Sequence, residues 1–266
     1  MNQSFMSMTF PLAHKQYLNN IMHAYNLVAV HEKAGLDAEG HAKRGKRGAP
    51  MSVNRAIVLM AVATWQATIE DLTLAAFALG PNVGNQKKSN ALLTEVEKFS
   101  TPATHQVRGL FARNIFSPDQ PQTPFDPAKA WNWQQAGGRG AGRSTHDAAT
   151  IANTLDSWTH IRHAVAHGHD DLFGQLAGQK VCDVSVGWES HSAGCAKGVP
   201  LKDPALAVSR QARAGKNPSL TLADARQCLH FFERLTRVTA NSLIAHVGAQ
   251  HHGNTKLPWR YSPPRK

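Results

Sequence analysis

The chain has 266 residues, and its hydrophobic fraction of 42% is enough to bury a sizeable core, which excludes a disordered protein. Its 29 lysine and arginine residues outnumber 18 acidic residues, giving a formal net charge of +11 and a pI near 9.9. This excess favours a polyanionic partner, either nucleic acid or an acidic membrane surface; the alternative is that the charge only keeps the protein soluble.

The first expected helix runs from about Pro11 to Ala34, where apolar side chains recur at helical spacing. A flexible loop with several glycines follows it. The cationic residues of that loop are Lys43, Arg44, Lys46 and Arg47. Together with Arg139, Arg143 and Arg210 further along the chain, they are candidates for guiding a polyanionic backbone, such as that of RNA.

The second helix is expected from about Val53 to Leu79, with Ser52 as its N-cap, and its pattern is the clearest in the chain. Its apolar stripe steps by three and four residues through Val58, Val62, Trp65, Ile69, Leu72 and Ala76. Glu70 and Asp71 lie off this stripe. These two acids are therefore candidate partners for a cation on a neighbouring helix.

The rest of the chain is predicted as alternating helices and irregular segments. Shorter helices are expected over Asn90–Phe99 and Thr104–Ile115, and a longer one from Thr145 or His146 to Gly168. The stretch from Ser117 to Arg143 is rich in proline, glycine and glutamine, and we expect it to be irregular in part. A last long helix is expected after Thr221, ending near Val247.

We expect one all-α domain over residues 1–266. Residues 176–217 are glycine-rich and are interpreted as an insertion that includes a small hairpin around Val181–Trp188. Residues 250–266 are expected to form a loose basic tail. No stretch resembles a membrane span, and the N-terminus lacks the pattern of a signal peptide. The three cysteines are odd in number and sparse, which argues against a disulfide framework, so a cytoplasmic protein without membrane contact is expected.

The segment DSWTHIRHAVAHGHDD, residues 156–171, carries the clearest candidate chemistry. Arg162 falls four residues after Trp158, within the apolar stripe of its helix. Because a guanidinium cannot be neutralised, it must face a carboxylate such as Glu70 or Asp71, a subunit interface or an anion. His167 precedes Gly168 at the expected end of the helix, where the helix dipole favours the imidazolium and proton exchange near neutral pH becomes available.

This R-H-A-V-A-H-G segment resembles the signature of the HEPN superfamily (higher eukaryotes and prokaryotes nucleotide-binding domains). In the signature, an arginine followed by a polar residue precedes a histidine at a helix end, positions that Arg162, His163 and His167 occupy here. The helix AIVLMAVATWQATIEDLTLAA and the order of the later helices are similar to a bacterial branch called RiboL-PSP-HEPN. The resemblance covers most of the chain, but not residues 176–217 or the tail.

The resemblance implies an HEPN-like helical bundle that acts as a homodimer and cleaves RNA without a metal or other cofactor. His167 would assist proton transfer at the ribose 2′-hydroxyl, Arg162 would stabilise charge on the phosphate, and His163 would orient the pair. A role as a toxin or phage-defence effector, with an antitoxin or regulatory partner, is implied by the resemblance alone. Arg162 and His167 are about 140° apart on an ideal helix, so two helices would converge these side chains better than one.

Two rival functions remain at this point. An inactive HEPN-type protein would bind RNA, or regulate, without cleaving it. Alternatively, His160, His163 and His167 share a helix face and could bind a metal, with His169 and Asp170 close behind. The loop residues Cys182, His191 and Cys195 match no strong metal pattern. Trp131, Trp133 and Trp259 could stack on bases, but aromatic residues in loops more often pack as core anchors.

Overall fold

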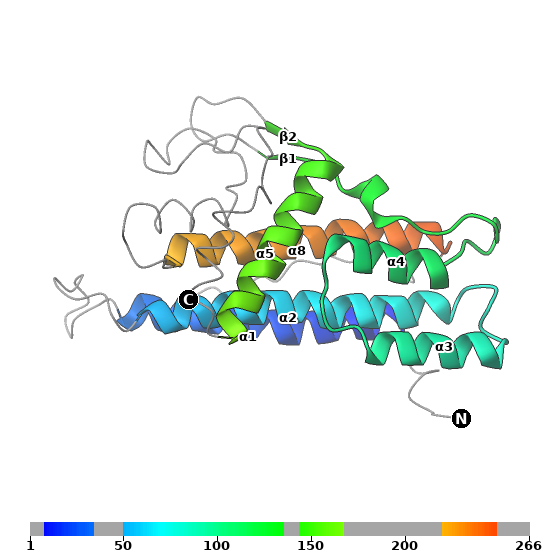
Figure 1. The fold of residues 1–266 in the computed structure, drawn as a ribbon, viewed down its shortest axis with the longest axis horizontal. Helices are drawn as coiled ribbons and strands as arrows, with labels where there is room; N and C mark the ends of the chain where they lie inside the picture. Colours follow the sequence, from blue (N-terminus) through cyan, green and yellow to red (C-terminus); the bar gives the residue numbers. More distant parts are fainter. Residues whose placement is uncertain (1–7, 35–49, 136–143, 168–219, 249–266) are drawn as a thin grey trace.

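The computed structural model describes residues 8–34, 50–135, 144–167 and 220–248. Within them the chain is mostly helical, and its helices are arranged as Figure 1 shows. The α-helices are α1 (Phe10–Ala34), α2 (Pro50–Phe77), α3 (Gln86–Glu97), α4 (Thr104–Asn114), α5 (Ala148–His167) and α8 (Leu222–His246). The all-α expectation is confirmed for this part of the chain.

Three long helices form the body of the molecule, and a fourth crosses them. α1, α2 and α8 lie along the long axis and pack on one another, while α5 runs obliquely across α2 and α8 (Figure 1). α3 and α4 lie beside one half of this bundle (Figure 1). The crossing of α5 places its C-terminal end, which carries the Arg162–His167 segment, away from α3 and α4.

α2 is the central helix, in contact with α1, α4, α5 and α8. All six side chains of its predicted apolar stripe are buried. The stretch Ser52–Phe77 is long and apolar enough to cross a membrane by length and composition, whereas the sequence was expected to contain no such span. Its contacts with helices on several sides account for an apolar character all round, as in the core helix of a packed bundle.

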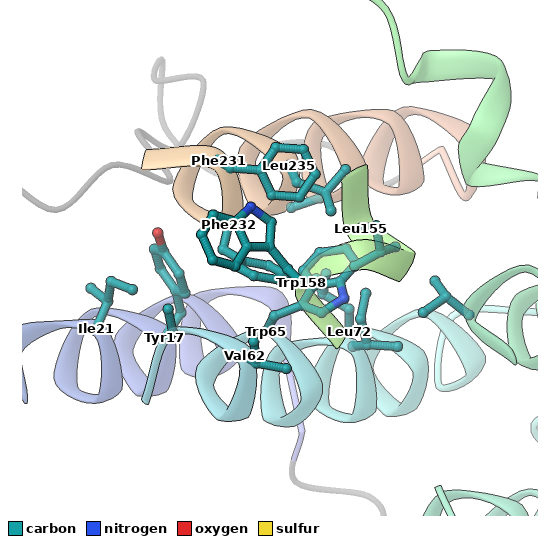
Figure 2. Close-up of a cluster of buried hydrophobic side chains, with 14 of the residues drawn as sticks. Tyr17, Ile21, Val62, Trp65, Leu72, Leu155, Trp158, Phe231, Phe232 and Leu235 are labelled. Atoms are coloured by element: carbon teal, nitrogen blue, oxygen red, sulfur yellow. The ribbon is translucent and has the colours of Figure 1, made fainter. Parts of the chain in front are cut away.

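Aromatic side chains join the helices across the core. The rings of Trp65 on α2 and Phe232 on α8 lie 6.2 Å apart, with Trp158 of α5 in the same cluster (Figure 2). Trp65 also donates its indole N–H to the carbonyl of Pro102 at 3.3 Å. Burying an aromatic side chain of this size contributes roughly 2–3 kcal/mol. This cluster therefore fixes the distance of α5 from the central helix.

Four buried threonines donate their hydroxyls within their own helices. Thr68 and Thr73 of α2 donate to the carbonyl four residues earlier, each at 2.6 Å. Thr154 and Thr159 of α5 do the same, at 2.8 and 2.9 Å. Because these hydroxyls have acceptors inside the helix, they enter the core without the cost of an unpaired polar group.

The helix boundaries differ from the sequence expectation at three N-termini. α2 begins at Pro50, so Ser52 lies inside its first turn and is not its N-cap. α3 begins at Gln86, four residues before the expected Asn90, because the side chain of Asn85 accepts a hydrogen bond from the Lys88 amide at 3.1 Å. α5 begins at Ala148, whereas the helix was expected from Thr145 or His146.

The late start of α5 has a tertiary cause. Residues Ser144–His146 form strand β2, which pairs antiparallel with β1 (Trp133–Gln135) and places His146 opposite Trp133. An extended backbone cannot continue a helix, so the helix begins only after this pairing ends. The N-terminus of α8 agrees with the expectation: Thr221 is its N-cap and forms a capping box with Asp224.

The segment between α4 and β1 is irregular in part, as predicted, but it is anchored. It contains an isolated bridge between Phe116 and Pro124 and the short 3-10 helix η2 (Pro127–Ala130). Trp131 and Trp133 are buried, and the Trp131 indole donates to the Thr239 hydroxyl of α8 at 3.0 Å. These two tryptophans are therefore core anchors, and this confirms the packing interpretation over base stacking.

Several predictions concern residues outside the described part of the chain. They are the insertion over residues 176–217 with its hairpin, the tail over residues 250–266 with Trp259, and the loop candidates Cys182, His191 and Cys195. The division of the chain into one domain with an insertion and a tail stays a prediction.

Candidate functional site

The helix that carries the candidate motif is fixed at its beginning. Asp147 accepts a hydrogen bond from the Thr150 amide at 2.8 Å, and its backbone carbonyl accepts from the Ile151 amide at 3.0 Å. These hydrogen bonds lower the pKa of the Asp147 carboxyl below its ordinary value. A carboxylate at this position satisfies the first amides of α5 and complements its dipole, so the N-terminus of α5 is well defined.

A clamp between α4 and α5 holds the middle of the motif helix. The hydroxyl of Thr104 donates to the Ala152 carbonyl at 3.0 Å, and the Thr104 amide donates to Asp156 Oδ1 at 2.7 Å. The N-cap residue of α4 is Ala103, whose side chain has no oxygen that could accept a hydrogen bond. Asp156 therefore supplies from α5 the acceptor that the first turn of α4 lacks.

The buried face of α5 extends almost to the end of the helix. Ile161 is fully buried and Ala164 nearly so, while Val165 is only partly buried against the core. Arg162 is half-buried rather than central to the buried stripe, because Ile161 takes the position that faces the core. Arg162 thus lies at the boundary between core and solvent, where a charged side chain can be accommodated.

No carboxylate in the described part of the chain forms an ion pair with Arg162. Ion pairs in that part of the chain include Arg108 with Asp126, Arg113 with Glu95 and Arg226 with Glu32. Half-buried guanidinium groups favour a planar anionic partner such as carboxylate or phosphate.

Two of the three histidines of α5, His160 and His163, are exposed to solvent. The third, His167, is the last residue of the helix. The side chain of His167 lies outside the described part, as do His169 and Asp170. The metal alternative for the histidine face therefore stays untested; within the described residues no three His, Cys, Asp or Glu side chains gather as a metal site would require.

α5 remains an α-helix through His167, so its last turn keeps regular geometry. Arg162 and His167 are then separated by about 140° of rotation and about 7.5 Å of rise. Side chains so placed point to different sides of one helix. Their convergence on one phosphate is easier if each comes from a different helix, as across a two-fold axis.

Each of the two acids of α2 accepts hydrogen bonds from a glutamine side chain. Glu70 accepts a hydrogen bond from Gln66 at 3.1 Å, and Gln66 also donates to the Phe99 carbonyl at 2.7 Å. Asp71 faces α1, where the amide nitrogen of Gln16, once oriented towards it, donates to both carboxylate oxygens at 2.5 and 3.2 Å. Their suggested support of Arg162 stays a prediction.

Burial raises the pKa of both acids. The pKa of Asp71 rises to about 7, mainly through burial and secondarily through the neighbouring charge of Glu70, while the hydrogen bonds from Gln16 act against the rise. The pKa of Glu70 rises as well because of burial, and the hydrogen bond from Gln66 opposes the rise. Asp71 is thus a proton-exchanging group near neutral pH on the α1 side of α2.

The residues predicted to bind RNA lie outside the described part of the chain: Lys43, Arg44, Lys46, Arg47, Arg139, Arg143 and Arg210. The structure instead draws attention to cations on α8 that the sequence reading did not single out, namely Arg226, His230, Arg234 and Arg237. Their spacing of four, four and three residues was the available signal, since it places them on one helix face.

Comparison with known proteins adds no assignment: no family model, no curated protein and no solved structure matches the chain.

Proposed function

We propose that the protein is a metal-independent endoribonuclease of HEPN type, working as a homodimer. The observation that carries the proposal is the combination on α5 of a half-buried Arg162, without an ion-pair partner among the described residues, and a histidine at the helix end. The net charge of +11 supports a polyanionic substrate. A cytoplasmic location and a role as a toxin or phage-defence effector, with an antitoxin or regulatory partner, belong to the same proposal.

The proposed reaction is an internal attack of the ribose 2′-oxygen on the neighbouring phosphorus. His167 removes the proton of the 2′-hydroxyl as the new P–O2′ bond forms. The P–O5′ bond breaks, and the leaving 5′-oxygen takes up a proton from water or from a histidine in the site. The products are a 2′,3′-cyclic phosphate and a 5′-hydroxyl, so no oxidant, reductant or metal enters the balance.

Arg162 stabilises the charge that develops on the non-bridging phosphate oxygens. Its planar fork can donate two parallel hydrogen bonds to them, which a lysine ammonium cannot do with the same geometry. Exposed His163 would orient the substrate beside this pair. Fixed donors aimed at a developing negative charge commonly contribute 10²–10³ in rate, about 3–4 kcal/mol.

The test is cleavage of RNA in excess EDTA with product-end analysis, comparing the wild type with His167→Ala and Arg162→Lys. We expect wild-type cleavage to leave cyclic phosphate, and both variants to lose about 10²–10⁴ in rate. His160→Ala is the matched control, because His160 is exposed on the same helix and lies outside the proposed set.

Cleavage that persists in His167→Ala would place the active site elsewhere. Absence of cleavage by the wild type, with RNA still bound, would favour the second candidate, an RNA-binding HEPN-type protein without catalysis. Activity that is lost in EDTA and restored by zinc would favour a metal site on the histidine face.

A further inference from the structure

The solvent side of α8 carries a row of cations. On a helix with 100° between successive residues, Arg226, His230, Arg234 and Arg237 fall within an arc of about 80° and a length of about 17 Å. Arg226 and His230 are exposed, and Arg234 and Arg237 are half-buried. We call these four residues the α8 strip.

The opposite side of α8 faces the core. The strip therefore lies on the part of this largely buried helix that is turned away from the core. Buried side chains such as Phe232 and Leu235 occupy the core side (Figure 2), and Leu229 is buried as well. Within the arc of the strip, the other residues of α8 are the exposed Ala223, the half-buried Asn241 and, at the edge of the arc, the buried Ile244. No carboxylate among the described residues of α8 falls in that arc.

The acids near the strip lie at its margins. Glu32 of α1 forms an ion pair with Arg226 at one end. Glu233 is buried at the edge towards α1, accepts a hydrogen bond from Tyr25 at 3.0 Å, and has Oε2 3.7 Å from His230 Nδ1. The three arginines of the strip outnumber Glu32 and Glu233, which leaves an excess of positive charge along it.

The guanidinium of Arg234 is held in place. Its central carbon lies 5.2 Å from the centre of the Trp133 ring, and Trp133 is itself buried, in strand β1. Burial and the neighbouring charge of Arg237 lower the pKa of Arg234 below its ordinary value. Two close arginines that repel each other gain most from an anion that contacts both.

We propose that the α8 strip binds the phosphate backbone of a nucleic acid strand. This rests on the proposed function in that the strand is the RNA substrate, and it assigns the surface that holds the RNA outside the reacting site. Arg234 and Arg237 contribute the main phosphate contacts, while Arg226 and His230 extend the track towards the N-terminus of α8.

Two other anionic partners fit less well. A membrane surface needs apolar side chains that insert between lipids, but the large exposed apolar residues of the described chain are on α1 and near the end of α2: Met22, Val30, Leu79 and Val83. An acidic protein would need an apolar patch at the centre of its interface, and the strip contains none.

The experiment measures binding of a labelled single-stranded RNA by fluorescence anisotropy, in a His167→Ala background so that the RNA is not consumed. We expect the Arg234→Gln/Arg237→Gln variant to bind about tenfold more weakly at moderate salt. Its slope of log K against log salt should be shallower by about 1.4, which corresponds to two phosphate contacts on a single strand.

Matched controls separate the strip from overall charge. Arg108→Gln/Arg113→Gln removes the same two charges from α4, where each arginine already pairs with a carboxylate. This control should leave the salt slope unchanged. Equal weakening by both double variants would mean that only net charge matters, and no weakening by either would remove the strip from RNA binding; both results overturn the proposal.

A second variant guards against loss of folding, since Arg234 packs on Trp133. Ala223→Glu adds an acid to the arc of the strip at an exposed position in the first turn of α8, where the helix dipole favours a carboxylate. It should weaken RNA binding severalfold, whereas Ala91→Glu, the same change at an exposed position of α3, should not. Equal behaviour of these two variants also overturns the proposal.

The remaining readouts identify the partner and separate this proposal from the proposed function. Polyglutamate and phosphatidylserine vesicles are tested as competitors. If either competes as well as RNA, with the same dependence on Arg234 and Arg237, the partner of the strip is another polyanion and the proposal of a nucleic acid is rejected. In the protein with His167 intact, strip variants should raise KM and leave kcat unchanged. If RNA is cleaved but the strip variants have no effect, only the proposal for the strip is rejected. If RNA binding depends on the strip but no cleavage occurs, only the proposed enzymatic function is rejected.

Discussion

A single carboxyl on α2 couples the stability of the protein to pH. In the folded protein the pKa of Asp71 is about 7, compared with an ordinary 3.8, so the folded state binds more protons than the unfolded state between these values. The stability contributed by the protonated form is fully present below about pH 4 and is lost as pH rises through 7.

Replacing Asp71 with asparagine removes this loss. We expect Asp71→Asn to increase the free energy of unfolding at pH 8 by roughly 1–2 kcal/mol, well below the full value of the pKa shift because the carboxyl is partly exposed and Gln16 donates to it. Urea denaturation at pH 4.5 and 8 measures the difference, which should shrink at the lower pH. Asp119→Asn, at an exposed loop position, serves as control; a larger gain at pH 4.5 than at pH 8 would contradict the assignment.

The spacing of apolar residues in the sequence predicted which side chains are buried better than it predicted which side chains contact one another. All six apolar residues of the α2 stripe from Val58 to Ala76 are buried, because their helical spacing places them on one face of the helix, and that face packs inward. Arg162 was placed in the middle of a stripe, but Ile161 is the residue that faces the core. The partner of Asp71, Gln16 of α1, depends on how neighbouring helices pack, and a helical pattern carries no information on that.

At the helix ends, too, some features were predictable from the sequence and others were not. α8 begins after Thr221 as predicted, since its capping box lies within four consecutive residues. α4 depends on Asp156, which is 52 residues away in the chain, and α5 starts late because β2 pairs with β1. Local sequence determines a local cap, whereas a cap or a strand partner supplied from elsewhere is visible only in the folded chain.

The cap from Asp156 can be tested at this scale. Asp156→Ala leaves the Thr104 amide without its acceptor and should lower the free energy of unfolding by about 1–2 kcal/mol. Asp156→Asn retains an oxygen that can accept the hydrogen bond and should lose less than half of that amount. Thermal or urea denaturation of both variants measures this order, and equal losses would show that the charge, not the hydrogen bond, matters.

At the scale of the whole molecule, the regular geometry of α5 through His167 makes a prediction about assembly. If each site takes Arg162 from one subunit and His167 from the other, a mixed dimer of Arg162→Ala and His167→Ala subunits has one complete site. Random mixing makes half of the dimers mixed, with one of two sites intact, so about a quarter of the wild-type activity should return.

This complementation is measured by unfolding and refolding the two inactive variants together and assaying RNA cleavage. Each variant refolded alone should stay inactive. If both residues of a site come from one subunit, mixing restores nothing, which would reject the shared site while leaving the proposed reaction intact.

Four buried threonines of α2 and α5, namely Thr68, Thr73, Thr154 and Thr159, have a consequence for how the sequence can change over time. Each hydroxyl bonds to a carbonyl of its own helix, and that carbonyl still has its ordinary amide partner if the hydroxyl is removed. Valine or serine at these positions would orphan no polar group elsewhere in the core. Such substitutions can accumulate independently of one another. Homologous proteins can therefore differ at these positions while the packing of the bundle is preserved.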